Sequence, residues 1–174
     1  MLELQKEFKF EASHILPKHP GRCSRLHGHS WKLRVSVMGN INPETGFVMD
    51  YADLKKVIEP IVESLDHRHL GQWGNMGHFH GSVITLIKGW EVVGMPLEFY
   101  PSSENLIVWI ANQIGDKLDS YLVNRSGGWV PKASPVPQGE LPKAEHYWSR
   151  LELDETCTSR CILTREAYDA GSRR

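Results

Sequence analysis

Two segments near the start of the chain alternate between apolar and polar residues. From His27 to about residue 38, every second residue is a histidine, a tryptophan or an aliphatic residue, and the residues between them are mainly polar. The segment at about 4–14 repeats this pattern, with an apolar face that ends at His14. Because successive side chains of a strand point to opposite faces, a period of two predicts two long strands, each with one buried face.

Two later segments have apolar residues at intervals of three and four, the spacing of one face of a helix. The first covers about 51–65, with Asp50 as its N-cap. Within it, Pro60 predicts a kink or a division into two short helices. The second helix is expected to be capped by one of the serines at 102 and 103 and to reach about Leu118.

Shorter strands are expected at about 47–49, 145–155 and 160–165, with a short hairpin at about 82–93. The order of three strands, two helices and two strands favours an α+β fold, in which helices cover one face of an antiparallel sheet. We expect residues 1–174 to form a single domain.

The composition is typical of a globular protein. Hydrophobic residues make up 40% and charged residues 24% of the chain, and the formal charge is −1. This balance argues against binding of nucleic acid through bulk charge, and no apolar run approaches the ~20 residues of a membrane-spanning helix. Three cysteines in a chain of this length, without a signal-peptide pattern, indicate reduced thiols and a cytoplasmic protein.

Three histidines on the two long strands form a candidate metal site. His27 and His29 are two residues apart, so their rings project from one face, and His14 ends the apolar face of the other strand. If these strands pair, three imidazole nitrogens converge and leave a coordination position open, which is typical of catalytic zinc. The pattern His-x-His also arises by chance, and three histidines accept several divalent metals.

Other residues with reactive side chains accompany these histidines. Cys23 lies in a loop with two arginines, where positive charge favours the thiolate, and it is a candidate base, nucleophile or fourth metal ligand, or a plain loop cysteine. Asp66 precedes His67, and a carboxylate that holds an imidazole suits a general acid or base. Adjacent residues need not touch, however, and His69 is a rival for this role.

Glu155 continues the apolar face of the strand expected at 145–155. A buried carboxylate needs a polar partner. It could hold the amino–amide edge of a pterin or a guanine through two parallel hydrogen bonds. The alternative is a residue at the end of a strand that reaches water.

The order of these motifs resembles that of the 6-pyruvoyl tetrahydropterin synthase superfamily. The resemblance covers about 1–69, 101–118 and 145–165. The residues between Cys23 and the His-Gly-His motif make the chain most similar to the bacterial 6-carboxy-5,6,7,8-tetrahydropterin synthase branch. The motifs are Phe10-Glu11-Ala12-Ser13-His14, Cys23-Ser24-Arg25-Leu26-His27-Gly28-His29-Ser30, Leu65-Asp66-His67, Pro101-Ser102-Ser103-Glu104-Asn105 and Glu155-Thr156-Cys157-Thr158.

This resemblance implies the tunnelling fold, an α+β domain with a four-stranded antiparallel sheet and two helices on one face. Subunits of this fold assemble into a β-barrel, commonly a homohexamer of two stacked trimers, with active sites between subunits. Relative to the family pattern, the segments at about 70–100 and 121–145 are insertions. The residues with implied roles are His14, His27 and His29 as ligands of Zn²⁺, Cys23, Asp66 and His67 as the catalytic triad, Glu155 as the pterin anchor and Glu104 as a second substrate contact.

The implied reaction converts 7,8-dihydroneopterin triphosphate to 6-carboxytetrahydropterin, acetaldehyde and triphosphate, on the route to 7-deazaguanines such as queuosine. The insertions leave an altered substrate or assembly open, and the modified bases could belong to transfer RNA or to DNA. One alternative is the sister activity, 6-pyruvoyl tetrahydropterin synthesis, which keeps the side chain. Another is a zinc-binding module without catalysis. A cupin-type iron site is disfavoured, because no carboxylate follows the histidine pair at the required spacing.

Overall fold

The computed structural model describes residues 2–71, 94–95, 100–125 and 147–171. In this part of the chain, six strands form one mixed sheet in the order β4-β3-β1-β2-β5-β6. The strands are β1 (Leu2–His14), β2 (His27–Gly39), β3 (Arg68–Leu70), β4 (Gly94–Met95), β5 (Tyr147–Asp154) and β6 (Arg160–Thr164). The helices are the 3-10 turn η1 (Arg22–Ser24) and the α-helices α1 (Tyr51–Leu65), α2 (Ser103–Arg125) and α3 (Arg165–Gly171). The predicted α+β class is therefore confirmed.

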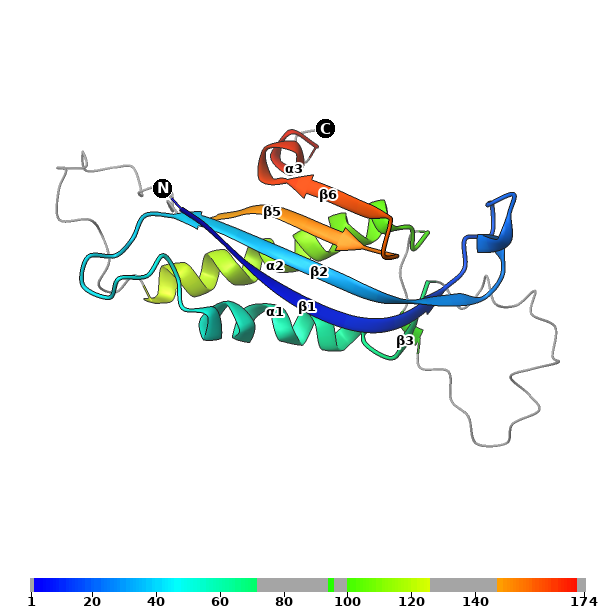
Figure 1. Cartoon of the computed structure of the whole chain (residues 1–174), viewed down its shortest axis with the longest axis horizontal. Coiled ribbons are helices and arrows are strands. Elements are labelled where there is room, and N and C mark those ends of the chain that lie inside the picture. The colour runs from blue at the N-terminus through cyan, green and yellow to red at the C-terminus, as the bar shows by residue number, and fades with distance from the viewer. Residues whose placement is uncertain (1, 72–93, 96–99, 126–146, 172–174) are drawn as a thin grey trace.

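The antiparallel pair β1–β2 is the centre of the sheet. Its register is continuous from Leu2 opposite Gly39 to His14 opposite His27. Because side chains alternate along both strands, the apolar faces point to the same side, where α1 and α2 cover the sheet (Figure 1). The strand residues buried there include Phe8, Phe10, Ala12, Trp31, Leu33, Val35 and Val37.

The sheet is larger than the four antiparallel strands that the sequence predicted. β1, β2, β5 and β6 do form an antiparallel set. At the other edge, β3 pairs with β1 and β4 pairs with β3, both in parallel. A strand of three residues such as β3 is too short for its period to be recognised in the sequence.

Helix α1 has the predicted bounds and the predicted cap. The Asp50 carboxylate accepts a hydrogen bond from the Ala52 N–H, at 2.7 Å. The helix continues through Pro60, so the division into two short helices was wrong. Pro60 lies on the exposed side of α1. There, water can bind the Lys56 carbonyl, which lacks its usual helical donor.

Three further expectations need correction or fall outside the described residues. Helix α2 begins after Ser102, whose hydroxyl accepts from the Asn105 N–H, but it continues to Arg125 rather than ending near residue 118. Residues 47–49 do not form a strand, since they follow a turn in which the Asn42 N–H donates to the Phe47 carbonyl. The hairpin at 82–93, and most of the segments 70–100 and 121–145, lie outside the described residues. Helix α3 was not predicted.

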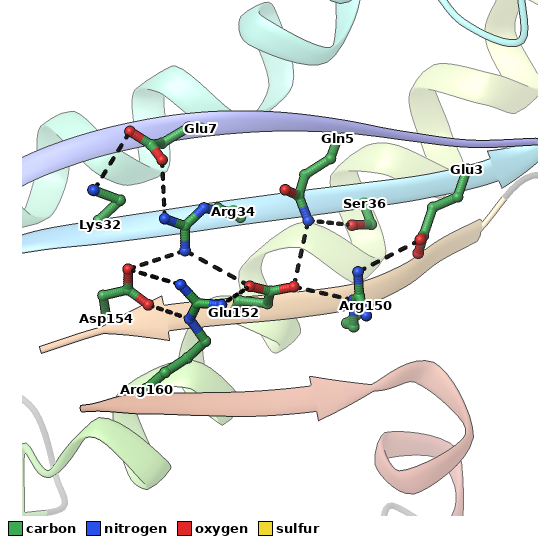
Figure 2. A network of polar contacts seen from close by, with 10 residues as sticks. All are labelled: Glu3, Gln5, Glu7, Lys32, Arg34, Ser36, Arg150, Glu152, Asp154 and Arg160. Atoms are coloured by element: carbon green, nitrogen blue, oxygen red, sulfur yellow. Dashed lines mark hydrogen bonds and ion pairs between the residues drawn. The ribbon is translucent and has the colours of Figure 1, made fainter. Parts of the chain in front are cut away.

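The face of the sheet opposite α1 and α2 carries a network of charged side chains (Figure 2). At its centre, Glu152 is 6% exposed. It lies 2.9 Å from an Arg160 nitrogen, 3.2 Å from Arg150 and 3.6 Å from Arg34. Ionic pairing therefore satisfies the charge that the sheet buries on this face. None of the described helices is long and apolar enough to cross a membrane.

Replacement of Leu33 by Ala is expected to lower the free energy of unfolding by about 2–5 kcal/mol, because it opens a cavity in the core. Leu33 is 0% exposed, whereas Leu2, the matched control, is 53% exposed. Leu2→Ala is expected to change the free energy by less than about 0.5 kcal/mol. Urea unfolding measures both values, and equal losses would contradict the assigned buried face.

Candidate metal and active site

The β1–β2 register brings the three candidate metal ligands together. His14 ends β1 opposite His27 at the start of β2, and His29 faces the same side two residues later. One ligand nitrogen from each ring lies within 4.8 Å of those of the other two. The ring centroids are between 4.5 and 5.1 Å apart. The structure thus supplies a set of three imidazoles that could hold a metal ion.

Gly28 and Trp31 shape the floor of this site. A Cβ at Gly28 would lie 3.3 Å from the Ala12 carbonyl oxygen, so the absence of a side chain lets the two strands approach between the histidines. The Trp31 ring stands edge-on to His14 and His29, with centroid distances of 5.3 and 5.5 Å. Its indole N–H donates to the Ala12 carbonyl, at 3.2 Å, which holds this apolar wall in place.

Backbone carbonyls orient two of the imidazoles. His14 Nδ1 lies 2.7 Å from the Pro101 carbonyl oxygen, and His27 Nδ1 lies 2.7 Å from that of Arg25. A carbonyl only accepts, so each Nδ1 carries the proton and each neutral ring keeps a lone pair at Nε2. The Nε2 atoms of all three histidines are buried without a hydrogen-bond partner. Three nitrogen atoms with free lone pairs, close together and without hydrogen-bond partners, are suited to bind a metal ion.

Burial favours the neutral form of two of these imidazoles, His14 and His29. It lowers the pKa of His14 to about 4, although the hydrogen bond to Pro101 opposes the shift. Burial also lowers the pKa of His29, where the Glu155 carboxylate acts in the opposite direction. Because metals bind neutral imidazole, these ligands are ready for a metal near neutral pH.

Glu155 lies beside the histidine cluster. It follows the last residue of β5 on the face of Leu151 and Leu153. Its Oε1 atom is 3.3 Å from His14 Nε2 and 3.6 Å from His29 Nε2. Its side chain is 23% exposed, so the carboxylate contacts the cluster and is also accessible to solvent.

Asp66 and His67 form a second, separate group. His67 Nδ1 lies 2.8 Å from Asp66 Oδ2, while Asp66 Oδ1 accepts from the Glu11 N–H, also at 2.8 Å. That backbone hydrogen bond is the main cause that lowers the pKa of Asp66, and the hydrogen bond with His67 adds to it. His67 has a φ of 54°, in the left-handed region, and its N–H donates to the Glu11 carbonyl. Strand β1 therefore holds the pair in place. The contact between the side chains of Asp66 and His67, which the sequence could not establish, does occur.

The two groups do not meet within one chain. His67 is bonded to Glu11, three residues before His14 on β1, which corresponds to about 10 Å along a strand. The His67 side chain is 79% exposed, and it is not part of the three-histidine cluster. In contrast, His69, its rival, is 5% exposed and its Nδ1 lies 3.1 Å from the Ser13 hydroxyl.

Cys23 lies in η1, just before the histidine strand. Its carbonyl accepts from the Leu16 N–H, at 2.9 Å, which closes the loop between β1 and β2. The side chain is half-buried and has no disulfide partner. The thiol is not part of the three-histidine cluster. Its role as a base in catalysis remains a prediction.

Glu104 lies in the first turn of α2, three residues after the carbonyl that orients His14. Hydrogen bonds from its own N–H and from Ser102 lower the pKa of its carboxyl. The side chain is exposed, so its role as a substrate contact also remains a prediction. Sequence reasoning missed Pro101, because a backbone carbonyl leaves no side-chain signal.

The fold and this arrangement of residues agree with the comparison of the chain to known families. A family model described as 6-pyruvoyl tetrahydropterin synthase matches residues 3–126, a region that includes every candidate site residue except Glu155. Because this match spans more than half of the chain, the protein belongs to the 6-pyruvoyl tetrahydropterin synthase family.

Individual relatives refine this picture. The chain is similar to 6-carboxy-5,6,7,8-tetrahydropterin synthase of Synechocystis, with 49% identity over 72 residues, which span 38% of this chain and 56% of that protein. It is 26% identical to the Haemophilus influenzae protein of the same name over 118 residues, 66% of this chain and 82% of that protein. The solved 6-pyruvoyl tetrahydropterin synthase of Plasmodium vivax has the same fold, with a TM-score of 0.62, 17% identity and coverage of 94% and 97%.

The three-histidine cluster is expected to bind one zinc ion per chain. His29→Ala should weaken zinc binding by more than about 100-fold, since it removes a direct ligand rather than an outer contact. Competition with a chromophoric chelator measures the affinity, and circular dichroism checks the fold. His67→Ala is the matched control, because its exposed ring lies outside the cluster, and an equal loss in this variant would contradict the assignment.

Burial of His69 is expected to make the metal-free protein less stable in acid. Burial lowers the pKa of His69 below its usual 6.5, so the unfolded chain binds this proton first as the pH falls. The contribution to the free energy of unfolding is therefore complete above about pH 6.5 and declines below it, by at most about 1.4 kcal/mol per pH unit. Urea unfolding at pH 7.5 and 5.5 should show a shallower decline in His69→Gln than in the wild type, and an equal decline would contradict this role of His69.

Proposed function

We propose that this protein is a zinc-dependent 6-carboxy-5,6,7,8-tetrahydropterin synthase. The observation that carries the proposal is the set of three clustered imidazoles whose Nε2 atoms are buried and unsatisfied, beside the carboxylate of Glu155. These groups offer a metal site next to an acceptor for the amino–amide edge of a pterin. Similarity to two bacterial proteins of that name supports the choice of activity within the family.

The substrate in this proposal is 7,8-dihydroneopterin triphosphate. With uptake of one water, it yields 6-carboxytetrahydropterin, acetaldehyde and triphosphate, which supplies the carbon skeleton for 7-deazaguanines such as queuosine. A zinc ion bound by His14, His27 and His29 would act as a Lewis acid that makes the hydroxyls of the substrate side chain more acidic.

The other residues hold the substrate and move protons. The Glu155 carboxylate accepts two hydrogen bonds from the pterin ring, and Glu104 makes a second contact. The Cys23 thiolate removes a proton from the substrate side chain. His67, held through Nδ1 by Asp66, returns a proton from its outer nitrogen. Loss of triphosphate and cleavage of a carbon–carbon bond follow from this exchange of protons.

A homo-oligomer completes this arrangement. Asp66 holds His67 in one orientation, yet the ring is 79% exposed and distant from the cluster of its own chain. A second copy of the chain would place its cluster against this exposed ring. We therefore propose a cytoplasmic homohexamer of two stacked trimers with active sites between subunits.

The alternative activity is 6-pyruvoyl tetrahydropterin synthesis, which the description of the matching family model favours. Both activities release triphosphate from the same substrate. They differ in whether the three-carbon side chain is cleaved, so the identity of the product separates them.

A product assay is expected to show cleavage. Zinc-loaded protein is incubated with 7,8-dihydroneopterin triphosphate, the pterin is identified by mass, and acetaldehyde is trapped. The expected products are a 6-carboxypterin and acetaldehyde in equal amounts. A retained three-carbon side chain would establish the alternative activity, and absence of turnover by the zinc-loaded oligomer would contradict both.

Cys23→Ala tests the assigned base in the same assay. Loss of a positioned base is expected to lower kcat by at least about 100-fold, while zinc binding is unchanged because the thiol lies outside the cluster. The matched control is Cys161→Ala, a half-buried cysteine on β6, which should retain activity. Full activity of Cys23→Ala would remove this residue from the mechanism.

A further inference from the structure

The loop that joins β1 to β2, residues 15–26, is basic and lies at the end of the sheet where β1 ends (Figure 1). It contains no acidic residue and three basic ones, Lys18, Arg22 and Arg25. Because His14 and His27 face each other on either side of this loop, the loop starts and finishes beside the three-histidine cluster. Its positive charge therefore attracts anions to the surroundings of the candidate metal site.

The guanidinium groups of this loop have no carboxylate partner in the described part of the chain. Arg22 and Arg25 are exposed, and neither side chain makes an ion pair or a hydrogen bond with a described residue. The arginines on the charged face of the sheet differ in this respect, because Arg34, Arg150 and Arg160 each contact at least one carboxylate. Those three charges are neutralised within the fold, whereas the two loop arginines are available to an anion from solution.

Contacts of the loop fix the backbone that carries these arginines. The Arg25 carbonyl accepts from His27 Nδ1, at 2.7 Å, so the backbone of Arg25 touches a candidate metal ligand. Arg22 begins η1, three residues earlier. The Lys18 ammonium lies over the Tyr100 ring, 5.3 Å from its centroid, which ties the loop to the segment before α2. Both guanidinium groups are therefore carried by backbone that is anchored at the site.

The proposed substrate carries its anionic group at the end remote from the ring. In 7,8-dihydroneopterin triphosphate, the hydroxyls are on the first two carbons of the side chain, and the triphosphate is esterified to the third. A metal that holds the hydroxyls therefore has the triphosphate on the side away from the pterin. We infer that Arg22 and Arg25 form a polyphosphate site that holds this triphosphate beside the metal. The inference rests on the proposed function for the identity of the ester alone.

Guanidinium groups suit a polyphosphate chain. Each presents a planar fork of N–H donors that binds two phosphate oxygens at once. Two forks suit a chain of several phosphates better than a single phosphate group, so the site is expected to prefer triphosphate to phosphate. Because the arginines are in place before the reaction, they also stabilise the charge on triphosphate as it leaves. The same contacts bind free triphosphate, which should therefore compete with the substrate.

Calorimetric titration of the zinc-loaded oligomer with inorganic triphosphate tests the site without turnover. The wild type is expected to bind triphosphate more tightly than diphosphate or phosphate. The double variant Arg22→Ala/Arg25→Ala should bind triphosphate at least about tenfold more weakly, because charge-assisted hydrogen bonds are lost. Lys55→Ala/Lys56→Ala, the matched control, removes the same charge from side chains of α1 that are 52% and 66% exposed, and should leave the affinity unchanged.

Triphosphate also binds zinc, and the arginine variants separate this contribution. The zinc content after each titration shows whether the probe has removed the ion, and circular dichroism shows that each variant is folded. Equal affinity of the wild type and Arg22→Ala/Arg25→Ala would mean that triphosphate contacts the metal alone, which would overturn the inference. Arg22→Lys/Arg25→Lys keeps the charge without the fork of donors, and should restore part of the affinity.

A comparison of 7,8-dihydroneopterin with its triphosphate separates this inference from the proposed function. Arg22→Ala/Arg25→Ala is expected to bind the triphosphate more weakly than the wild type does and to bind the unphosphorylated compound equally well. If the variant loses affinity for inorganic triphosphate but the wild type forms no product, the polyphosphate site stands and the proposed reaction fails. If the wild type forms product and the variant has an unchanged KM and an unchanged affinity for inorganic triphosphate, the inference fails alone.

Discussion

His14 and His27 face each other because two strands of 13 residues each keep one uninterrupted register. The side-chain period of a strand is two, so a slip of one residue would turn the whole apolar face of β1 toward the charged side of the sheet. Burial of that face against α1 and α2 excludes the slip. The hydrophobic core therefore fixes the geometry of the candidate metal ligands.

Much of this arrangement could be predicted because both long strands have one buried face. Their period of two gave the strands, their phase and the grouping of His14, His27 and His29. The apolar stripe and the Asp50 cap likewise predicted α1. Two features could not be predicted from the sequence. Strand β3 is too short to show a period, and the ring of His14 is oriented by a backbone carbonyl.

Contacts between segments that are distant in the sequence account for the other features that could not be predicted. The proximity of Glu155 to His14 requires β5 to pair with β2, and alternation within β5 identifies its buried face but no partner strand. The contact between Asp66 and His67 requires a left-handed backbone at His67, which side-chain chemistry does not specify. The ionic network around Glu152 depends on the strand order, because its three arginines lie on β2, β5 and β6.

The hydrogen bond from His14 to the Pro101 carbonyl joins the metal site to the start of α2. Ser102, the next residue, caps that helix, so the ring can keep its orientation only while the helix is docked on the sheet. A metal ion bound by this ring would therefore be thermodynamically linked to helix docking, and each would favour the other to the same extent. Removal of such a metal ion would favour local unfolding at this end of α2, and displacement of the helix would in turn lower the affinity for the ion.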